Sequence, residues 1–451
     1  MTVAELRASF GLAGIFGLRM VGMFVILPVF ALYAERLPGG QNHTLIGLAL
    51  GGYGLTQACL QIPFGALSDR WGRKRTIYLG LLLFALGSFL AAAAHGIYMV
   101  ILGRIVQGSG AISAAVLALA ADLTRDEQRS KAMAIIGITI GAAFGLSLIA
   151  GPLLDQLIGV PGVFALTGVL ALVAMGAARW VVPDAARAVG AGTQRPRLLR
   201  LHLLLRGELA RLNFGIFTLH AVLMALFVVV PFELREAGLP EGSHWKVYLP
   251  VALGAFALML SPMILAERAH RQKMATLGAV LVLLAAQVGL AISGASLTGI
   301  VVSLLLFFTA FNLLEAILPS LVSRVAPVDS KGAAVGIYSS SQFLGAFVGA
   351  TTGGFVSQEL GSSWVFGFCA ALTLAWLLVA TAMRSLDVAG TRTYSVPRLD
   401  AERADGLSRK LASAPGVREA LIITGEGVAH LKVDNARFDE QIVLKLIAGE
   451  T

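Results

Sequence analysis

Apolar residues fill most of this chain in long runs, and short polar loops separate the runs. A helix needs about 20 apolar residues to cross a lipid bilayer. Runs of that length cover residues 10–33, 45–67, 77–95, 97–120, 131–155, 161–182, 213–234, 246–266, 275–294, 298–322, 332–357 and 363–384. The pattern therefore predicts an all-α membrane protein with twelve transmembrane helices. Arg19 interrupts the first run and no small-residue cleavage site follows, so we expect that run to be retained and not removed as a signal peptide.

The twelve runs divide into two similar sets of six. The loops at 67–75 and 265–273, after the second and eighth runs, both fit L-x-acid-R-x-x-R-x-basic. Such a duplication is typical of transporters whose halves rock around a central site. It predicts an N-terminal six-helix half at 1–183, a linker at 184–212 and a C-terminal six-helix half at 213–385. The linker carries arginines among leucines, which fits either an amphipathic helix on the membrane surface or a solvated linker.

The last residues, 386–451, differ from the rest in having the charge balance of a soluble domain. Their periodicity predicts a helix at 400–414, strands at 417–424 and 428–433, a helix at 438–448 and a further strand at 395–399. This β-α-β-β-α order resembles a ferredoxin-like or heavy-metal-associated fold. The paired cysteines of metal-binding members are missing, so we expect no metal site.

Composition and charge narrow the class of protein further. With 57% hydrophobic and 14% charged residues, the chain is too apolar for a soluble protein. Its formal net charge is +9, but no basic block is interleaved with aromatic residues, and we expect no nucleic-acid partner. The loops after even-numbered runs hold 18 Lys or Arg, whereas the loops after odd-numbered runs hold three. The positive-inside rule then predicts that both termini are cytoplasmic.

The loop at 65–77, GALSDRWGRKRTI, resembles the loop signature of the major facilitator superfamily of secondary transporters. Gly65 and Gly72 allow a sharp chain reversal. In that family the acid at the position of Asp69 contacts the start of the eleventh helix, and an arginine pairs with an acid at the end of the fourth. The resemblance implies a conformational latch between the halves, whose members are Gly65, Asp69, Arg70, Gly72, Arg73 and Asp122. The alternative is a basic loop that only sets membrane topology.

Two further motifs fit the same family. Arg104, Gln107 and Gly108 in the fourth run resemble an R-x-x-Q-G motif associated with proton coupling; the alternative is a structural arginine bonded to backbone carbonyls. The fifth run resembles the glycine-rich motif of drug antiporters, although the glycine pair expected after it is absent. Simple helix packing is the alternative. The residues of this glycine-rich motif are Gly137, Gly141, Gly145, Gly151 and Pro152.

Four ionisable residues lie deep in the predicted helices, where a charge is costly and indicates function. They are Arg19, Arg104, His220 and Glu315, and Asn312 lies beside the last of them. Glu315 is the only acid deep within a run, so it is our first candidate for a titrating group. Arg19 is a candidate to pair with Glu315 across the cavity or to bind an anionic substrate, with a structural ion pair as the alternative. His220 is the weaker candidate, because a satisfied polar histidine is as common.

Together with residues 18–24 and the C-terminal segment 415–434, these motifs resemble major facilitator transporters of the drug:proton antiporter type, in a subgroup with a small C-terminal soluble domain. The resemblance implies a monomeric transporter of the cell inner membrane that exports a small molecule by alternating access. A proton gradient would supply the energy. No nucleotide, metal or hydrolase motif is present, so we expect neither a cofactor nor enzymatic activity. The alternatives are an importer of sugars or organic anions, and a membrane sensor whose soluble tail recruits a partner.

Overall fold

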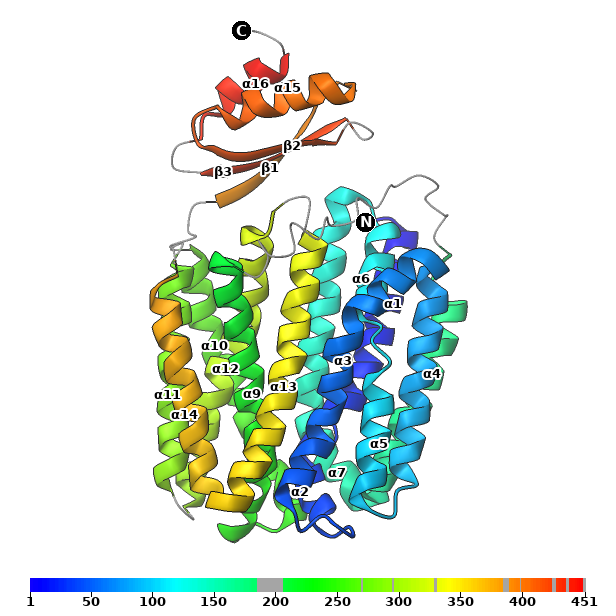
Figure 1. Ribbon diagram of the computed structural model, residues 1–451, viewed down its shortest axis with the longest axis vertical. Coiled ribbons are helices and arrows are strands. Elements are labelled where there is room, and N and C mark those ends of the chain that lie inside the picture. Colours follow the sequence, from blue (N-terminus) through cyan, green and yellow to red (C-terminus); the bar gives the residue numbers. More distant parts are fainter. Residues whose placement is uncertain are drawn as a thin grey trace.

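The computed structural model describes residues 1–184, 206–268, 271–293, 296–327, 331–383, 389–397, 399–423, 427–434 and 438–448. It consists of a bundle of long helices with a small sheet and two short helices at one end (Figure 1). We call this end of the bundle the sheet end and the opposite one the far end. Most of the predicted linker at 184–212 and the boundary predicted at 385–386 lie outside the described residues.

The first half of the bundle runs from α1 to α7. Its helices are α1 (Val3–Phe24), α2 (Leu27–Glu35), α3 (His43–Trp71), α4 (Arg73–Ala92), α5 (Ile97–Gly108), α6 (Ser113–Asp122) and α7 (Asp126–Trp180). The chain leaves helical geometry inside α7 at Gly159, whose φ of +67° favours glycine. The predicted runs 131–155 and 161–182 therefore lie on either side of a break in α7.

The second half runs from α9 to α14. Its helices are α9 (Gly207–Glu236), the short η1 (Glu241–Ser243), α10 (Trp245–Arg268), α11 (Gln272–Ser293), α12 (Leu297–Val325), α13 (Lys331–Leu360) and α14 (Ser362–Thr381). Among the described residues, ten helical segments are long and apolar enough to cross a membrane. This count takes α7 as one segment although α7 contains two of the predicted runs, and it leaves out α13. The total of twelve transmembrane helices therefore stays a prediction.

The C-terminal part forms a three-stranded antiparallel sheet in the order β1-β3-β2. Its elements are β1 (Ala389–Ser395), α15 (Ala401–Ala412), β2 (Val417–Ile423), β3 (Val428–Asp434) and α16 (Glu440–Ala448). Leu411, Leu431 and Val443 are fully buried between the helices and the sheet. The further strand predicted at 395–399 was wrong in position, because β1 lies earlier and pairs with the whole of β3. The ferredoxin-like assignment stays a prediction.

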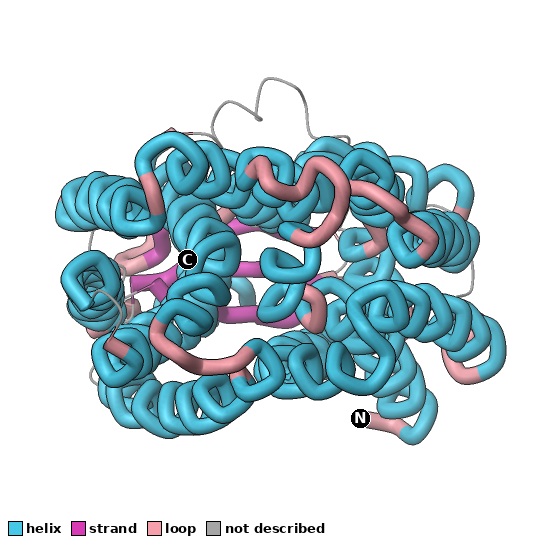
Figure 2. The backbone as a smooth tube through the Cα atoms, turned by 90° about the horizontal axis from the view of Figure 1, so that it is seen from below, coloured by secondary structure: helices cyan, strands magenta, loops and turns pink. Residues whose placement is uncertain are grey.

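The sheet lies between its two helices and the bundle (Figure 1). Seen along the bundle from the far end, the strands lie behind the middle of the ring of helices (Figure 2). The small domain is therefore placed over the centre of the bundle and not at its rim.

Helix α13 packs closely on both halves through small residues. A Cβ added at Gly345 or Gly349 would lie well under 3.0 Å from the carbonyl oxygen of Phe217 or Ala221 on α9. A Cβ at Gly47 of α3 would meet the backbone of Ala350 in the same way. These glycines allow the helix backbones to approach closely, as small residues do in membrane helix packing.

The glycines that the sequence singled out in the fifth run behave differently. Gly151 packs against Val25 at the break between α1 and α2, with Pro152 following it inside the helix. A Cβ at Gly137, Gly141 or Gly145 would meet nothing within 4 Å. In this conformation these three glycines therefore make no close helix contact with another described residue, and their role in helix packing stays a prediction.

Replacing Gly349 with Val is expected to destabilise the protein by about 1–3 kcal/mol or more, because the new side chain meets the α9 backbone and cannot be relieved by a rotamer change. Gly336→Val on the same helix is the matched control, since a Cβ there meets nothing within 4 Å. Thermal unfolding in detergent measures both. Equal melting temperatures for the two variants would contradict the close packing of α13 on α9.

Candidate functional site

Arg19, in the C-terminal part of α1, is only 1% exposed and is bound by neutral groups. Its Nη2 donates to the Tyr53 hydroxyl at 2.8 Å and to Gln57 Oε1 at 2.6 Å, both on α3. Gln57 donates in turn to Gln61 at 3.1 Å. Nη1 has a long contact of 3.5 Å with the Ser113 hydroxyl, and Nε has no hydrogen-bond partner among the described residues. Arg19 is thus a buried cation with hydrogen bonds but no counter-ion in the part of the chain that the structure describes.

Arg104 on α5 is a second buried arginine and lies near the first. It donates to Gln107 Oε1 at 2.5 Å, and Gln107 donates to the Ser88 hydroxyl at 2.8 Å. Two longer bonds reach the backbone carbonyls of Ala49 and Leu50. Its guanidinium carbon lies 5.0 Å from the centre of the Tyr53 ring. Tyr53 therefore contacts both arginines, and its ring and hydroxyl partly offset two charges.

Glu315 on α12 faces His220 on α9, with 3.5 Å between Oε1 and Nδ1. His220 Nδ1 lies 3.3 Å from the Ile216 carbonyl, and its Nε2 lies 2.8 Å from the amide nitrogen of Gln342. A carbonyl accepts and an amide nitrogen donates, so this arrangement fits a neutral imidazole with the proton on Nδ1. His220 then supplies no positive charge to Glu315. The acid keeps about a third of its side chain exposed, while Oε1 has no hydrogen-bond partner in the described structure.

The pairing of Arg19 with Glu315 considered from the sequence is not formed. Each residue instead contacts its own half: Arg19 reaches Ser113 at the start of α6, and His220 reaches Glu315 on α12. An internal repeat explains this, because residues 14–19 are GIFGLR and residues 215–220 are GIFTLH. Arg19 and His220 therefore occupy equivalent positions in the two halves, and this repeat is a sequence signal for their similar surroundings.

A row of side chains connects the two buried groups across the contact between the halves. The Tyr53 ring lies 6.3 Å from the ring of Phe343 on α13, and the residue before Phe343 is Gln342, which contacts His220. Tyr53, Phe343 and Gln342 were not singled out from the sequence, because isolated aromatic and amide residues in apolar helices carry no distinctive pattern. Asn312, one helical turn before Glu315, is partly buried.

At the sheet end, the loop between α3 and α4 brings charged groups together. Arg73 forms ion pairs with Asp69 and, at 3.0 Å, with Asp122 at the end of α6. Gly72 joins the two helices at a φ of +105°, a conformation that favours glycine, whereas Gly65 lies on α3 and Arg70 is exposed. All of these residues belong to the first half, and none of the described residues of α13 forms a hydrogen bond or ion pair with Asp69. The latch between halves stays a prediction.

Comparison with known proteins places this geometry in a family. The profile of the Major Facilitator Superfamily matches residues 12–350 and, in a second match, 264–398. The chain belongs to the major facilitator superfamily. It is 41% identical over 438 residues to the inner membrane transport protein YajR of Escherichia coli K12, covering 96% of each chain.

Two other similarities are more limited. The class D tetracycline resistance protein of Salmonella ordonez is 36% identical over 141 residues, which is 31% of this chain and 35% of that protein. The crystal structure of a bacterial homologue of the human lysosomal transporter Spinster, in an inward-facing and occupied conformation, matches with a TM-score of 0.70 and 14% identity. It covers 86% of this chain and 99% of that one, and it supports the fold alone. The chain is thus a membrane transporter of this superfamily.

The halves of this superfamily member are joined at the far end by charged and polar side chains. Glu35 of α2 pairs with Arg235 of α9 at 2.8 Å, and Arg36 pairs with Glu241 of η1. His43 at the start of α3 lies 2.9 Å from the Ser357 hydroxyl and stacks on Phe232, with ring centres 5.0 Å apart. We call these residues the far-end cluster. Among the described residues, every hydrogen bond or ion pair between the two halves lies at this end.

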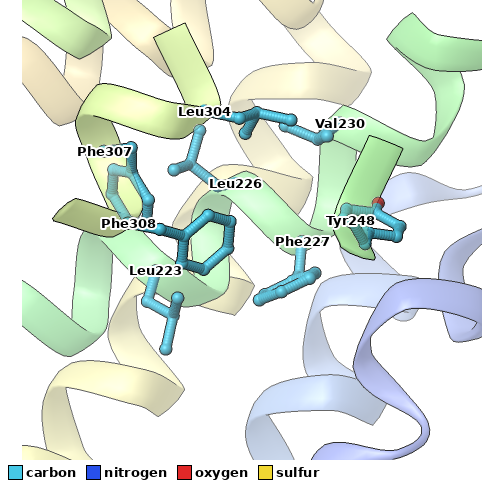
Figure 3. A pocket seen from close by; sticks show the side chains of 8 residues that line it. All are labelled: Leu223, Leu226, Phe227, Val230, Tyr248, Leu304, Phe307 and Phe308. Atoms are coloured by element: carbon cyan, nitrogen blue, oxygen red, sulfur yellow. The ribbon is translucent and has the colours of Figure 1, made fainter. Parts of the chain in front are cut away.

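A small apolar pocket lies in the second half, toward the far end from His220 and Glu315. It is lined by residues of α9, α10 and α12, which are Leu223, Leu226, Phe227, Val230, Tyr248, Leu304, Phe307 and Phe308 (Figure 3). The Phe308 ring also lies 6.1 Å from the ring of Phe144 on α7. The pocket is therefore continuous with an aromatic contact between the halves.

Proposed function

We propose that the chain is a proton-coupled secondary transporter that exports a small molecule by alternating access, with Glu315 carrying the proton. The observation that carries this proposal is the environment of Glu315. It is an acid in the middle of a membrane helix, partly exposed, beside an imidazole that is already satisfied as a neutral ring. A group in this position is available to exchange a proton.

The coupling follows from the cost of a charge in this environment. An ionised carboxylate in a membrane interior is costly unless a proton or a cation neutralises it. Because His220 is neutral in this arrangement, a proton or a positively charged part of a substrate must do so. The two then compete for one acid, and competition for one site is the thermodynamic basis of exchange.

The arrangement of contacts supports an inward-facing state. The far-end cluster holds the halves together, whereas at the sheet end Arg73 binds only acids of its own half. The distribution of Lys and Arg favours a cytoplasmic sheet end, with both termini inside the cell. We infer that outward opening breaks the far-end cluster and brings Asp69 to the start of α13.

The relatives support export as the direction of transport. Tetracycline resistance proteins of classes D and B are 36% and 34% identical to the chain, each over 31% of its length. The similarity to YajR supports a location in the inner membrane.

Transport in everted membrane vesicles tests the direction. The vesicle interior is made acidic by respiration, and radiolabelled tetracycline serves as the probe. We expect accumulation inside the vesicles, with release of protons that a pH-sensitive dye reports. Vesicles without the protein are the control. Accumulation that requires an alkaline interior would contradict export and favour the importer.

A further inference from the structure

We propose that the substrate is amphoteric: a small molecule with an acidic oxygen group that binds Arg19 and a basic nitrogen that binds Glu315. This inference rests on the proposed function and names the class of substrate for the same central site. It is based on the opposite charges of Arg19 in the first half and Glu315 in the second half.

The acidic end is assigned to Arg19 because its charge has no counter-ion among the described residues. A buried cation without an anion is strongly destabilising, and a ligand carboxylate would supply the missing charge. Nε makes no hydrogen bond to another described residue, and Nη1 makes only the 3.5 Å contact with Ser113. A carboxylate accepts charge-assisted hydrogen bonds from guanidinium N–H groups, and Nε–H and Nη1–H are the donors that the described residues leave unused or nearly so.

The basic end is assigned to Glu315 and Tyr338. Oε1 of Glu315 and the hydroxyl of Tyr338 on α13 are both buried, and neither has a hydrogen-bond partner among the described residues. Buried polar atoms are normally hydrogen-bonded, so the unpartnered oxygens of these two side chains indicate a missing donor. An ammonium group carries three donors and a positive charge, so it supplies the donor and the counter-charge that Glu315 lacks among the described residues.

The region between the two ends is aromatic. Phe144 of the first half lies with its ring centre 5.0 Å from Phe24 and 5.7 Å from Phe311, and Phe311 lies 5.7 Å from His220. The rings come from both halves and are buried against one another, so the contact between the halves beside His220 and Glu315 is apolar. A substrate that binds Arg19 and Glu315 would contact both halves at once.

The charges of Arg19 and Glu315 also distinguish an amphoteric substrate from one that is only anionic or only cationic. A substrate that is only anionic would be repelled by ionised Glu315 and would bind best together with a proton, which is the rule for symport. A substrate that is only cationic would leave Arg19 without a counter-ion. An amphoteric substrate satisfies both groups, and its basic nitrogen displaces the proton from Glu315, which gives exchange.

Equilibrium binding to the full chain in detergent tests the inference with three matched probes. The probe 3-(4-(2-aminoethyl)phenyl)propionate carries both groups at opposite ends of a ring, phenethylamine carries only the amine, and 3-phenylpropionate carries only the carboxylate. We expect the probe with both groups to bind most tightly by titration calorimetry. Arg19→Gln should weaken this probe and 3-phenylpropionate by about 10-fold or more and leave phenethylamine unchanged, because the variant loses a charge-assisted hydrogen bond. Glu315→Gln should weaken the probe with both groups and phenethylamine and leave 3-phenylpropionate unchanged.

Phenethylamine should bind the Arg19→Gln variant, and 3-phenylpropionate the Glu315→Gln variant, as tightly as each binds the wild type. These unchanged affinities show that the variants are folded. Arg19→Lys keeps the charge and should lose less affinity for 3-phenylpropionate than Arg19→Gln. The inference is overturned if Arg19→Gln weakens phenethylamine as much as 3-phenylpropionate. It is also overturned if the probe with both groups binds no more tightly than the other two, or if none of the three binds at millimolar concentration. No proton gradient is used, so loss of proton-driven transport with this binding pattern intact would overturn the proposed function alone.

Discussion

Replacing Glu315 with Gln is expected to abolish proton-driven transport while exchange of substrate across the membrane continues at saturating substrate. Glutamine has the shape of a protonated glutamate but neither takes up nor releases a proton. The Glu315→Gln variant can therefore still bind substrate and change conformation, but no proton gradient can drive it. Reconstituted vesicles measure both activities, with accumulation under a pH gradient compared with exchange of labelled for unlabelled substrate.

The matched control for this variant is Glu359→Gln, because Glu359 is an exposed acid near the far end of α13. It should keep both activities. Proton-driven accumulation by the Glu315→Gln variant at the wild-type rate would exclude Glu315 as the proton carrier. Loss of exchange together with loss of accumulation would instead indicate a defect in substrate binding or in the conformational change.

Cross-linking the far-end cluster is expected to stop transport completely and reversibly. Glu35 and Arg235 form an ion pair between the halves, so cysteines at both positions are within reach of a short bifunctional methanethiosulfonate, which joins each thiol through a reducible disulfide. The exposed Cys59 is first replaced with Ser, whereas Cys369 is buried. The cross-link holds the far end closed, and a transporter that cannot open at one end completes no cycle. Reduction of the cross-link should restore the rate.

A cross-link within one half serves as the comparison. Glu208 and Arg211 form an ion pair on a single helix, α9, at the sheet end. The same reagent on cysteines at these two positions should leave transport unchanged, as should the reagent on each single cysteine at position 35 or 235. Continued transport by the cross-linked 35–235 pair would show that the far end need not open.

The sequence predicted the helical part of this protein well because a membrane-spanning helix is encoded locally. Each run of apolar residues satisfies its own backbone hydrogen bonds, so length and composition are enough to place it. The boundary between the runs 131–155 and 161–182 was predicted, and the break at Gly159 falls inside it. The residue itself was not predicted, because one glycine among many gives no sign of which will adopt a positive φ. The position of β1 was also missed, since pairing with β3 and not local preference decides where that strand lies.

The sequence indicated the charged residues of the candidate site but not the side chains that they contact. Arg19, Arg104, His220 and Glu315 stand out in the sequence because a charged side chain in an apolar run is costly. Their contacts depend on neighbouring helices: Arg19 is held by Tyr53 and Gln57, two ordinary residues of α3. The glycines of α7 show the same limit, because spacing alone does not tell whether a glycine face meets another helix or open space.

The far-end cluster also makes the balance between conformations depend on the surrounding medium. Its two ion pairs are partly exposed, and exposed pairs of this kind contribute about 0.2–1 kcal/mol each. Dissolved salt screens such pairs, while the buried contacts of Arg19 and Arg104 are screened far less. Rising ionic strength at the far end would therefore favour opening at that end by a few-fold. The salt concentration on that side of the membrane would then adjust how often the transporter opens to it.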